Sequence, residues 1–201
     1  WQLRHCRAKF EQTGLVRPWP IAKVPAGAVD ASLAPGALGP QVGAETVFLP
    51  ELNVLGGISD FETWVLSAVA KKSTCIFEFG TCTGKTTYLL ARNAPANAEV
   101  ITLTLPPDQR ETYVDGVGDA RGDRVAALTE SAFSAFYYQG TAVDSRVTQL
   151  FAVSKTFDET PYLGTCDLIF VDGAHAPAYV ASHTRKALRT VAPVTTHRRR
   201  T

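Results

Sequence analysis

The chain has 201 residues, 45% of them hydrophobic, so it can bury one sizeable core and gives little reason to expect two. A formal net charge of +1 with 19% charged residues excludes the strong overall field that gathers nucleic acid or anionic lipid. No apolar run reaches the roughly 18 residues that cross a bilayer. We therefore expect a soluble, cytoplasmic protein without a nucleic-acid or membrane partner, and the oligomeric state stays open.

Four cysteines show no CxxC pair and no metal-ligand spacing, which predicts neither a zinc site nor a disulfide framework. Reduced thiols fit the expected cytoplasmic location. The chain starts at Trp1 and contains no Met, so an initiator residue is missing. We expect the sequence to be a fragment, a trimmed product or a processed product.

Residues 1–57 are predicted to form an irregular N-terminal extension, because Pro, Gly and Ala crowd the stretch 17–57 and disfavour long helices. The pattern changes at Ser59, which is followed three residues later by Glu62 in the arrangement of a capping box. Apolar residues at helical spacing come next. They predict a helix over 60–71.

Alternating strand and helix patterns follow. An apolar strand over 74–79 leads through a glycine loop into a helix over 85–93, and a β-branched strand covers 99–105. The polar stretch 107–145 is predicted to be a long connection, with a short helix over 125–135.

Regular patterns resume with strands over 147–153 and 166–172 and a helix over 176–191. Apolar strands separated by helices predict parallel pairing with helices on both faces. The fold class is therefore α/β, a Rossmann-like doubly wound and mostly parallel sheet in three layers, over residues 58–193. In such sheets ligands bind at the carboxyl ends of the strands, where the chain turns after Phe79 and after Asp172.

The loop after the first strand has the features of a nucleotide-binding loop. Gly80 and Gly84 allow a tight turn that presents N–H groups and a helix N-terminus to a ligand. Glu78 ends an otherwise apolar strand, where a carboxylate is costly to bury unless something donates hydrogen bonds to it. Ligand hydroxyls or an ammonium group would supply them. A purely conformational use of the glycines stays open.

A phosphate-binding P-loop is an alternative, since Gly84-Lys-Thr86 imitates the end of GxxxxGK[ST]. The spacing argues against it. The first glycine of that motif would fall on Phe79, and Gly80 leaves one residue too few. A P-loop-like nucleotide-binding protein is kept as the second alternative.

Two separated segments carry a family resemblance. Glu78-Phe-Gly-Thr-Cys-Thr-Gly84 resembles the first motif of the class I S-adenosylmethionine-dependent methyltransferases, an acidic residue followed by Gly-x-x-x-Gly. Asp172-Gly-Ala-His175, with Tyr179 and Val180, resembles the strand-four DGxHxYxxV signature of one branch of that family. The similarity covers about residues 46 to 193.

The resemblance implies S-adenosylmethionine as the cofactor and methyl transfer to an unidentified small-molecule acceptor as the activity. It implies catalytic roles for Asp172 and His175, and a divalent metal at these positions is a further expectation. A strand-ending turn at Asp172 and a helix cap at His175 are the alternatives. The cofactor-binding residues that it implies are Glu78, Phe79, Gly80, Thr81, Gly84, Thr104 and Ser154.

Several positions depart from the family pattern. Thr104 stands where an acidic ribose-binding residue is expected, and Val153 and His183 each stand where relatives carry Asp. A threonine hydroxyl lacks the charge and the bidentate reach of a carboxylate. The further strands expected after residue 193 are replaced by a basic tail over 194–201, to which we assign no function. A non-catalytic or truncated methyltransferase-like remnant therefore stays open as the first alternative.

Overall fold

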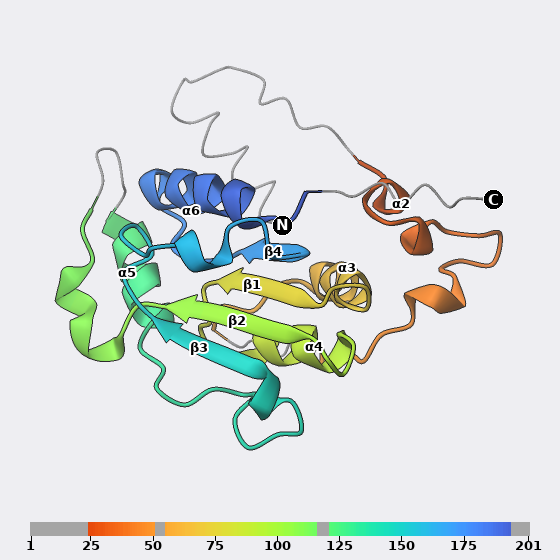
Figure 1. Ribbon diagram of the computed structural model, residues 1–201, viewed down its shortest axis with the longest axis horizontal. Coiled ribbons are helices and arrows are strands. Elements are labelled where there is room, and N and C mark those ends of the chain that lie inside the picture. Colours follow the sequence, from red (N-terminus) through yellow and green to blue (C-terminus); the bar gives the residue numbers. More distant parts are fainter. Residues whose placement is uncertain (1–23, 51–54, 116–120, 194–201) are drawn as a thin grey trace.

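The structure, a computed structural model, describes residues 24–50, 55–115 and 121–193. Within them four parallel strands form one sheet in the order β3-β2-β1-β4 (Figure 1). The strands are β1 (Cys75–Phe79), β2 (Glu99–Thr104), β3 (Val147–Phe151) and β4 (Leu168–Val171). All four predicted strands are confirmed, with ends that differ by at most two residues. The chain moves outward from β1 through β2 to β3 and then returns to the other side of β1, so the strand order switches between β1 and β4.

Helices cover both faces of the sheet. α3 (Asp60–Ala70) and α4 (Lys85–Asn93) lie on one face, and α6 (Pro177–Thr190) lies on the other (Figure 1). Their hydrophobic contacts agree, because Ile76 packs with Leu90 of α4 while Phe77 packs with Ala187 of α6. The predicted three-layer α/β fold is therefore confirmed.

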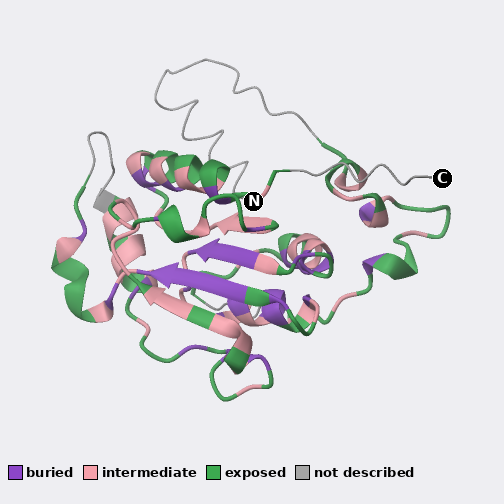
Figure 2. Cartoon of the chain, viewed as in Figure 1, coloured by how far each residue is buried: buried purple, intermediate pink, exposed green. Residues whose placement is uncertain are grey.

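The alternation of side chains along β1 decides which layer each residue meets. Ile76 faces α4 and Phe77 faces α6, so Glu78 faces α4 again and Phe79 faces α6. The central strands are β1 and β2, which have helices on both faces of the sheet and a paired strand along each edge. Figure 2 shows β1 and β2 buried over most of their length, whereas the outer strand β4 is only partly buried.

The helix predicted over 125–135 is misplaced. α5 runs instead over Arg121–Glu130, at the carboxyl end of the sheet (Figure 1). The chain leaves the helix after Glu130, and Phe136 and Tyr138 then enter the core between the sheet and α4. The first turn of α5 carries almost no apolar residue, so apolar periodicity could not indicate where this helix begins.

The capping box predicted before α3 is present. The Glu62 amide donates to Ser59 Oγ at 3.3 Å, and Glu62 Oε2 accepts from the Ser59 amide at 3.0 Å. Of the predicted N-terminal extension, residues 24–50 contain only short helices: α2 (Ala26–Val29), η1 (Ala31–Leu33) and η2 (Val42–Ala44). Residues 1–23 and the basic tail 194–201 lie outside the described residues.

Three short 3-10 helices interrupt the described connections between strands. They are η3 (Pro107–Thr112), η4 (Asp144–Arg146) and η5 (Thr160–Tyr162). Among the described residues, no helix has the length and apolar composition that a membrane crossing requires.

Candidate functional site

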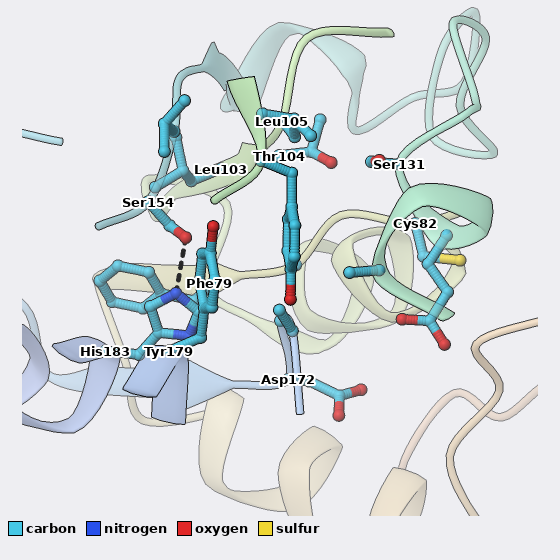
Figure 3. A pocket seen from close by; sticks show the side chains of 17 residues that line it. Phe79, Cys82, Leu103, Thr104, Leu105, Ser131, Ser154, Asp172, Tyr179 and His183 are labelled. Carbon is cyan, nitrogen blue, oxygen red and sulfur yellow. Dashed lines mark hydrogen bonds between the residues drawn. The ribbon is translucent and has the colours of Figure 1, made fainter. Parts of the chain in front are cut away.

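A pocket lies at the carboxyl ends of the strands, beside the switch in strand order (Figure 3). It brings together five of the predicted site residues, which come from the ends of all four strands: Phe79, Gly80, Thr104, Ser154 and Asp172. Glu78, Thr81, Gly84 and His175 are not among its lining residues. Chain segments that are far apart in the sequence therefore meet at one site, although part of the predicted set lies outside it.

The pocket is narrow. Its cavity volume is about 60 Å³, well below the several hundred Å³ of a typical ligand site. The rings of Tyr113 and Tyr179 form one wall, where they stack with centroids 4.7 Å apart and planes 7° apart. A nucleoside-sized ligand therefore requires the side chains of this wall to move.

Gly80 allows β1 and β4 to approach closely at the pocket. Its φ of +107° favours glycine, and a Cβ at this position would collide with the backbone carbonyl of Asp172 and lie 2.8 Å from the Gly173 Cα. The Asp172 amide donates to the Phe79 carbonyl at 2.8 Å on the same side. Glycine at position 80 is thus required by the contact between the two strand ends.

Gly84 contacts a different part of the chain. Its φ is +75°, and a Cβ there would lie 2.9 Å from Phe136 Cβ and 3.2 Å from the Tyr137 amide nitrogen. The Tyr137 amide also donates to the Thr83 carbonyl at 2.8 Å. Packing against this segment explains the glycine, and the predicted contact of Gly84 with a cofactor stays a prediction.

Glu78 is buried against α4, outside the pocket. Its Oε2 accepts hydrogen bonds from the hydroxyls of Thr87 and Thr102, the second at 2.7 Å, and Oε1 is buried without a partner among the described residues. Burial raises the pKa of Glu78 to about 7, because desolvation outweighs the bonds from Thr87 and Thr102, and the charge of Asp172 adds to the rise. The donors that the sequence led us to expect from a ligand come here from the protein.

The Glu78 carboxylate ends a buried chain of hydrogen bonds that includes Thr81. The Thr81 and Thr102 hydroxyl oxygens are 2.7 Å apart, and Gln149 Nε2 donates to Thr81 Oγ1 at 3.1 Å. The Tyr138 hydroxyl in turn donates to Gln149 Oε1 at 2.9 Å. Sequence analysis missed these partners, although polar residues inside apolar strands were a visible signal. The network holds the glycine loop to β2 and β3.

Two carboxylates line the pocket, Asp172 and Glu130. Burial raises the pKa of Asp172 to about 6, with His175 opposing the rise and Glu130 adding to it. Burial also raises the pKa of Glu130, and His175 opposes that rise as well. His175 thus acts on both carboxylates through its charge, although it does not line the pocket. Sequence analysis missed Glu130, because it lies in the long connection where no motif marks it.

The expected divalent metal gains no support from this geometry. In the part of the chain that the structure describes, no group of three or more His, Cys, Asp or Glu side chains is placed to hold a metal ion.

His183 and Ser154 meet in the wall of the pocket. His183 Nε2 lies 2.6 Å from Ser154 Oγ, and the imidazole stacks on Phe79 with ring centroids 5.1 Å apart (Figure 3). Burial lowers the pKa of His183 to about 4, and the charges of Lys186 and Lys155 add to the effect. A neutral imidazole therefore stands where the resemblance predicted an acidic residue.

Comparison with known families decides the assignment of this fold. A family model described as a methyltransferase domain matches residues 77–196, more than half of the chain. The chain belongs to this methyltransferase family. The matched segment begins within β1 and includes the glycine loop, β2, β3 and β4. No curated protein matches the methyltransferase chain in sequence.

Several solved structures are similar to this methyltransferase domain. One is the O-methyltransferase TomG from Streptomyces achromogenes, solved in complex with SAM. It has 22% sequence identity and a TM-score of 0.45, and the match covers 71% of this chain and 55% of TomG. A putative O-methyltransferase from Klebsiella pneumoniae has 23% identity and a TM-score of 0.45 over 68% and 53% of the two chains. The O-methyltransferase from Bacillus cereus in complex with SAH has 18% identity and a TM-score of 0.48 over 70% and 56%. The methyltransferase domain thus spans about half the length of each.

The P-loop alternative is not favoured. In that interpretation Lys85 would hold a phosphate, but its Nζ donates to the Pro50 carbonyl at 2.9 Å. The family match points to a different use of the same loop.

Proposed function

We propose that this methyltransferase domain binds S-adenosylmethionine in the pocket and transfers its methyl group to a small-molecule acceptor. The observation that carries the proposal is the close approach of Gly80 to Asp172, which joins the glycine loop and the end of β4 at one pocket. The family match supports it, because it covers both segments. The non-catalytic or truncated remnant is the competing function.

The charge of the pocket fits such a ligand. Asp172 and Glu130 line it, and no Lys or Arg is among its described lining residues. Burial disfavours the charged form of both carboxylates, and a cation beside them would relieve that penalty. S-adenosylmethionine carries two positive groups, a sulfonium and an ammonium.

The chain's own contribution to the reaction is mainly to position the two reactants in line. When bound, S-adenosylmethionine supplies an electrophilic methyl group on a sulfonium whose sulfur leaves as a neutral thioether. Asp172, with its pKa of about 6, is ionised at neutral pH and can accept a proton at its carboxylate from an acceptor hydroxyl. His175 modulates that carboxylate through its charge. Thr104 and Ser154 line the same pocket, where the Thr104 hydroxyl can meet the nucleoside while the Ser154 hydroxyl already contacts His183.

Isothermal titration of the 201-residue chain with S-adenosylmethionine tests the proposal. We expect saturable binding by the original chain. The Gly80→Ala variant should bind at least about tenfold more weakly, because its Cβ forces the Asp172 carbonyl out of place at the pocket.

Gly39→Ala is the matched control. Gly39 has a φ of +103°, close to the +107° of Gly80, but a Cβ there meets nothing within 4 Å. Both variants therefore place a side chain at a similar positive φ, and only Gly80→Ala also disturbs the pocket. The contrary result is an original chain that is folded, with a normal circular dichroism spectrum and a cooperative melt, and yet binds no S-adenosylmethionine. That result would favour the non-catalytic or truncated remnant. Equal affinities of the two variants would remove the pocket assignment.

A further inference from the structure

Glu130 places a carboxylate in the pocket from outside the glycine loop and the strand ends. It is the last residue of α5 and lines the pocket together with Cys82 and Asp172. Its charge raises the pKa of both of these residues, and His175 opposes the raised pKa of Glu130 itself. Its side chain forms no hydrogen bond or ion pair with another described residue, and His175, which opposes its raised pKa, does not line the pocket.

The surroundings of Glu130 favour a positively charged partner. Asp172 is the other charged residue among the described lining residues, so the fixed charges of the wall are both negative. Lys155 lies close by but is engaged elsewhere, because its Nζ donates to the Val114 carbonyl at 3.0 Å and lies 4.0 Å from the Tyr179 ring centroid. Glu130 raises the pKa of Asp172, as like charges do, and His175 opposes that rise from outside the pocket lining.

A second feature of the wall points to a polar ligand. His183 is 1% exposed, and its Nδ1 is buried with no hydrogen-bond partner among the described residues. Buried polar atoms of this kind are normally satisfied. The pocket thus combines an unsatisfied nitrogen in its wall with two unpaired carboxylates.

We propose that Glu130 is a specificity-determining residue, which selects the cationic form of the cofactor by facing one of its positive groups across the pocket from Asp172. This inference rests on the proposed function, since it names how that same site recognises its ligand. Either the sulfonium or the ammonium of S-adenosylmethionine can supply the charge. A matched set of ligands separates these sources.

Titration calorimetry of the Glu130→Gln variant with three ligands tests the inference. Methylthioadenosine keeps the nucleoside and the thioether but has no charge, S-adenosylhomocysteine keeps the ammonium, and S-adenosylmethionine has both positive groups. We expect the variant to lose about tenfold in affinity for S-adenosylmethionine and less than about twofold for methylthioadenosine. An equal loss for S-adenosylhomocysteine assigns the contact to the ammonium, and an unchanged affinity assigns it to the sulfonium.

Glu45→Gln is the charge-matched control, because Glu45 is exposed and follows η2, away from the pocket. It changes the net charge by the same amount and should leave all three affinities unchanged. The inference is overturned if Glu130→Gln weakens methylthioadenosine as much as S-adenosylmethionine, or if it weakens neither, while the proposed function stands. If the original chain binds none of the three ligands, the proposed function fails and this inference fails with it.

Discussion

The Thr102 hydroxyl donates a hydrogen bond of 2.7 Å to Glu78 Oε2, and neither residue has any exposed surface. Thr102→Val keeps the shape of the side chain but leaves the carboxylate with one donor fewer. We expect the free energy of unfolding to fall by about 1–3 kcal/mol, the usual result of leaving a buried acceptor unsatisfied. Urea denaturation at neutral pH measures it.

Thr104→Val is the control for this change. Thr104 follows on the same strand, but its hydroxyl forms no hydrogen bond with a described residue, so we expect a loss below about 0.5 kcal/mol. Similar losses in the two variants would show that the bond to Glu78 contributes little.

Glu78 should make the stability of the domain depend on pH. Its pKa rises from 4.5 to about 7 on folding, so its stabilising contribution is complete below pH 4.5 and is lost as the pH rises through 7. Glu78→Gln cannot ionise. Between pH 4.5 and pH 8, the original chain should therefore lose roughly 3 kcal/mol of unfolding free energy relative to this variant. A constant difference across this range would contradict the raised pKa.

His183 should give the opposite pH dependence. Its pKa falls from 6.5 to about 4 on folding, so its contribution is complete above pH 6.5 and is lost as the pH falls toward 4. His183→Phe keeps a ring against Phe79 and cannot titrate. The advantage of the original chain over this variant should shrink by roughly 2–3 kcal/mol between pH 7.5 and pH 4.5. Ser154→Ala removes only the hydroxyl partner, and we expect its loss to be about 1 kcal/mol at pH 7.5.

Glu159 provides a comparison of two ion pairs on one carboxylate. It is buried and pairs with Lys186 at 3.0 Å and with Arg189 at 2.6 Å, yet the Lys186 side chain is 12% exposed and that of Arg189 is 61% exposed. Lys186→Met should therefore lower the unfolding free energy by about 3 kcal/mol. Arg189→Met should lower it by less than about 1 kcal/mol, because water screens the exposed pair. Thermal and urea unfolding measure both losses. A larger loss of unfolding free energy in Arg189→Met than in Lys186→Met would contradict this expectation.

The sequence by itself determined the layers of this protein. Strand and helix periodicity is local, so the capping box at Ser59, the four parallel strands and the helices on both faces could all be predicted, and so could the loop at Gly80. It also indicated that Glu78 needs hydrogen-bond donors. A local pattern does not reveal which donors reach a buried carboxylate, because they come from other elements, here from Thr87 on α4 and Thr102 on β2.

Only the tertiary structure decided which acidic residues face the pocket. Alternation along β1 turns Glu78 toward α4, whereas the pocket lies at the carboxyl ends of the strands, beyond Phe79. Glu130 reaches that pocket because the connection between β2 and β3 folds over the carboxyl ends of the strands, with α5 ending beside Cys82 and Asp172. That placement depends on contacts between residues distant in sequence, such as the burial of Phe136 and Tyr138 under the sheet, and no local spacing encodes it.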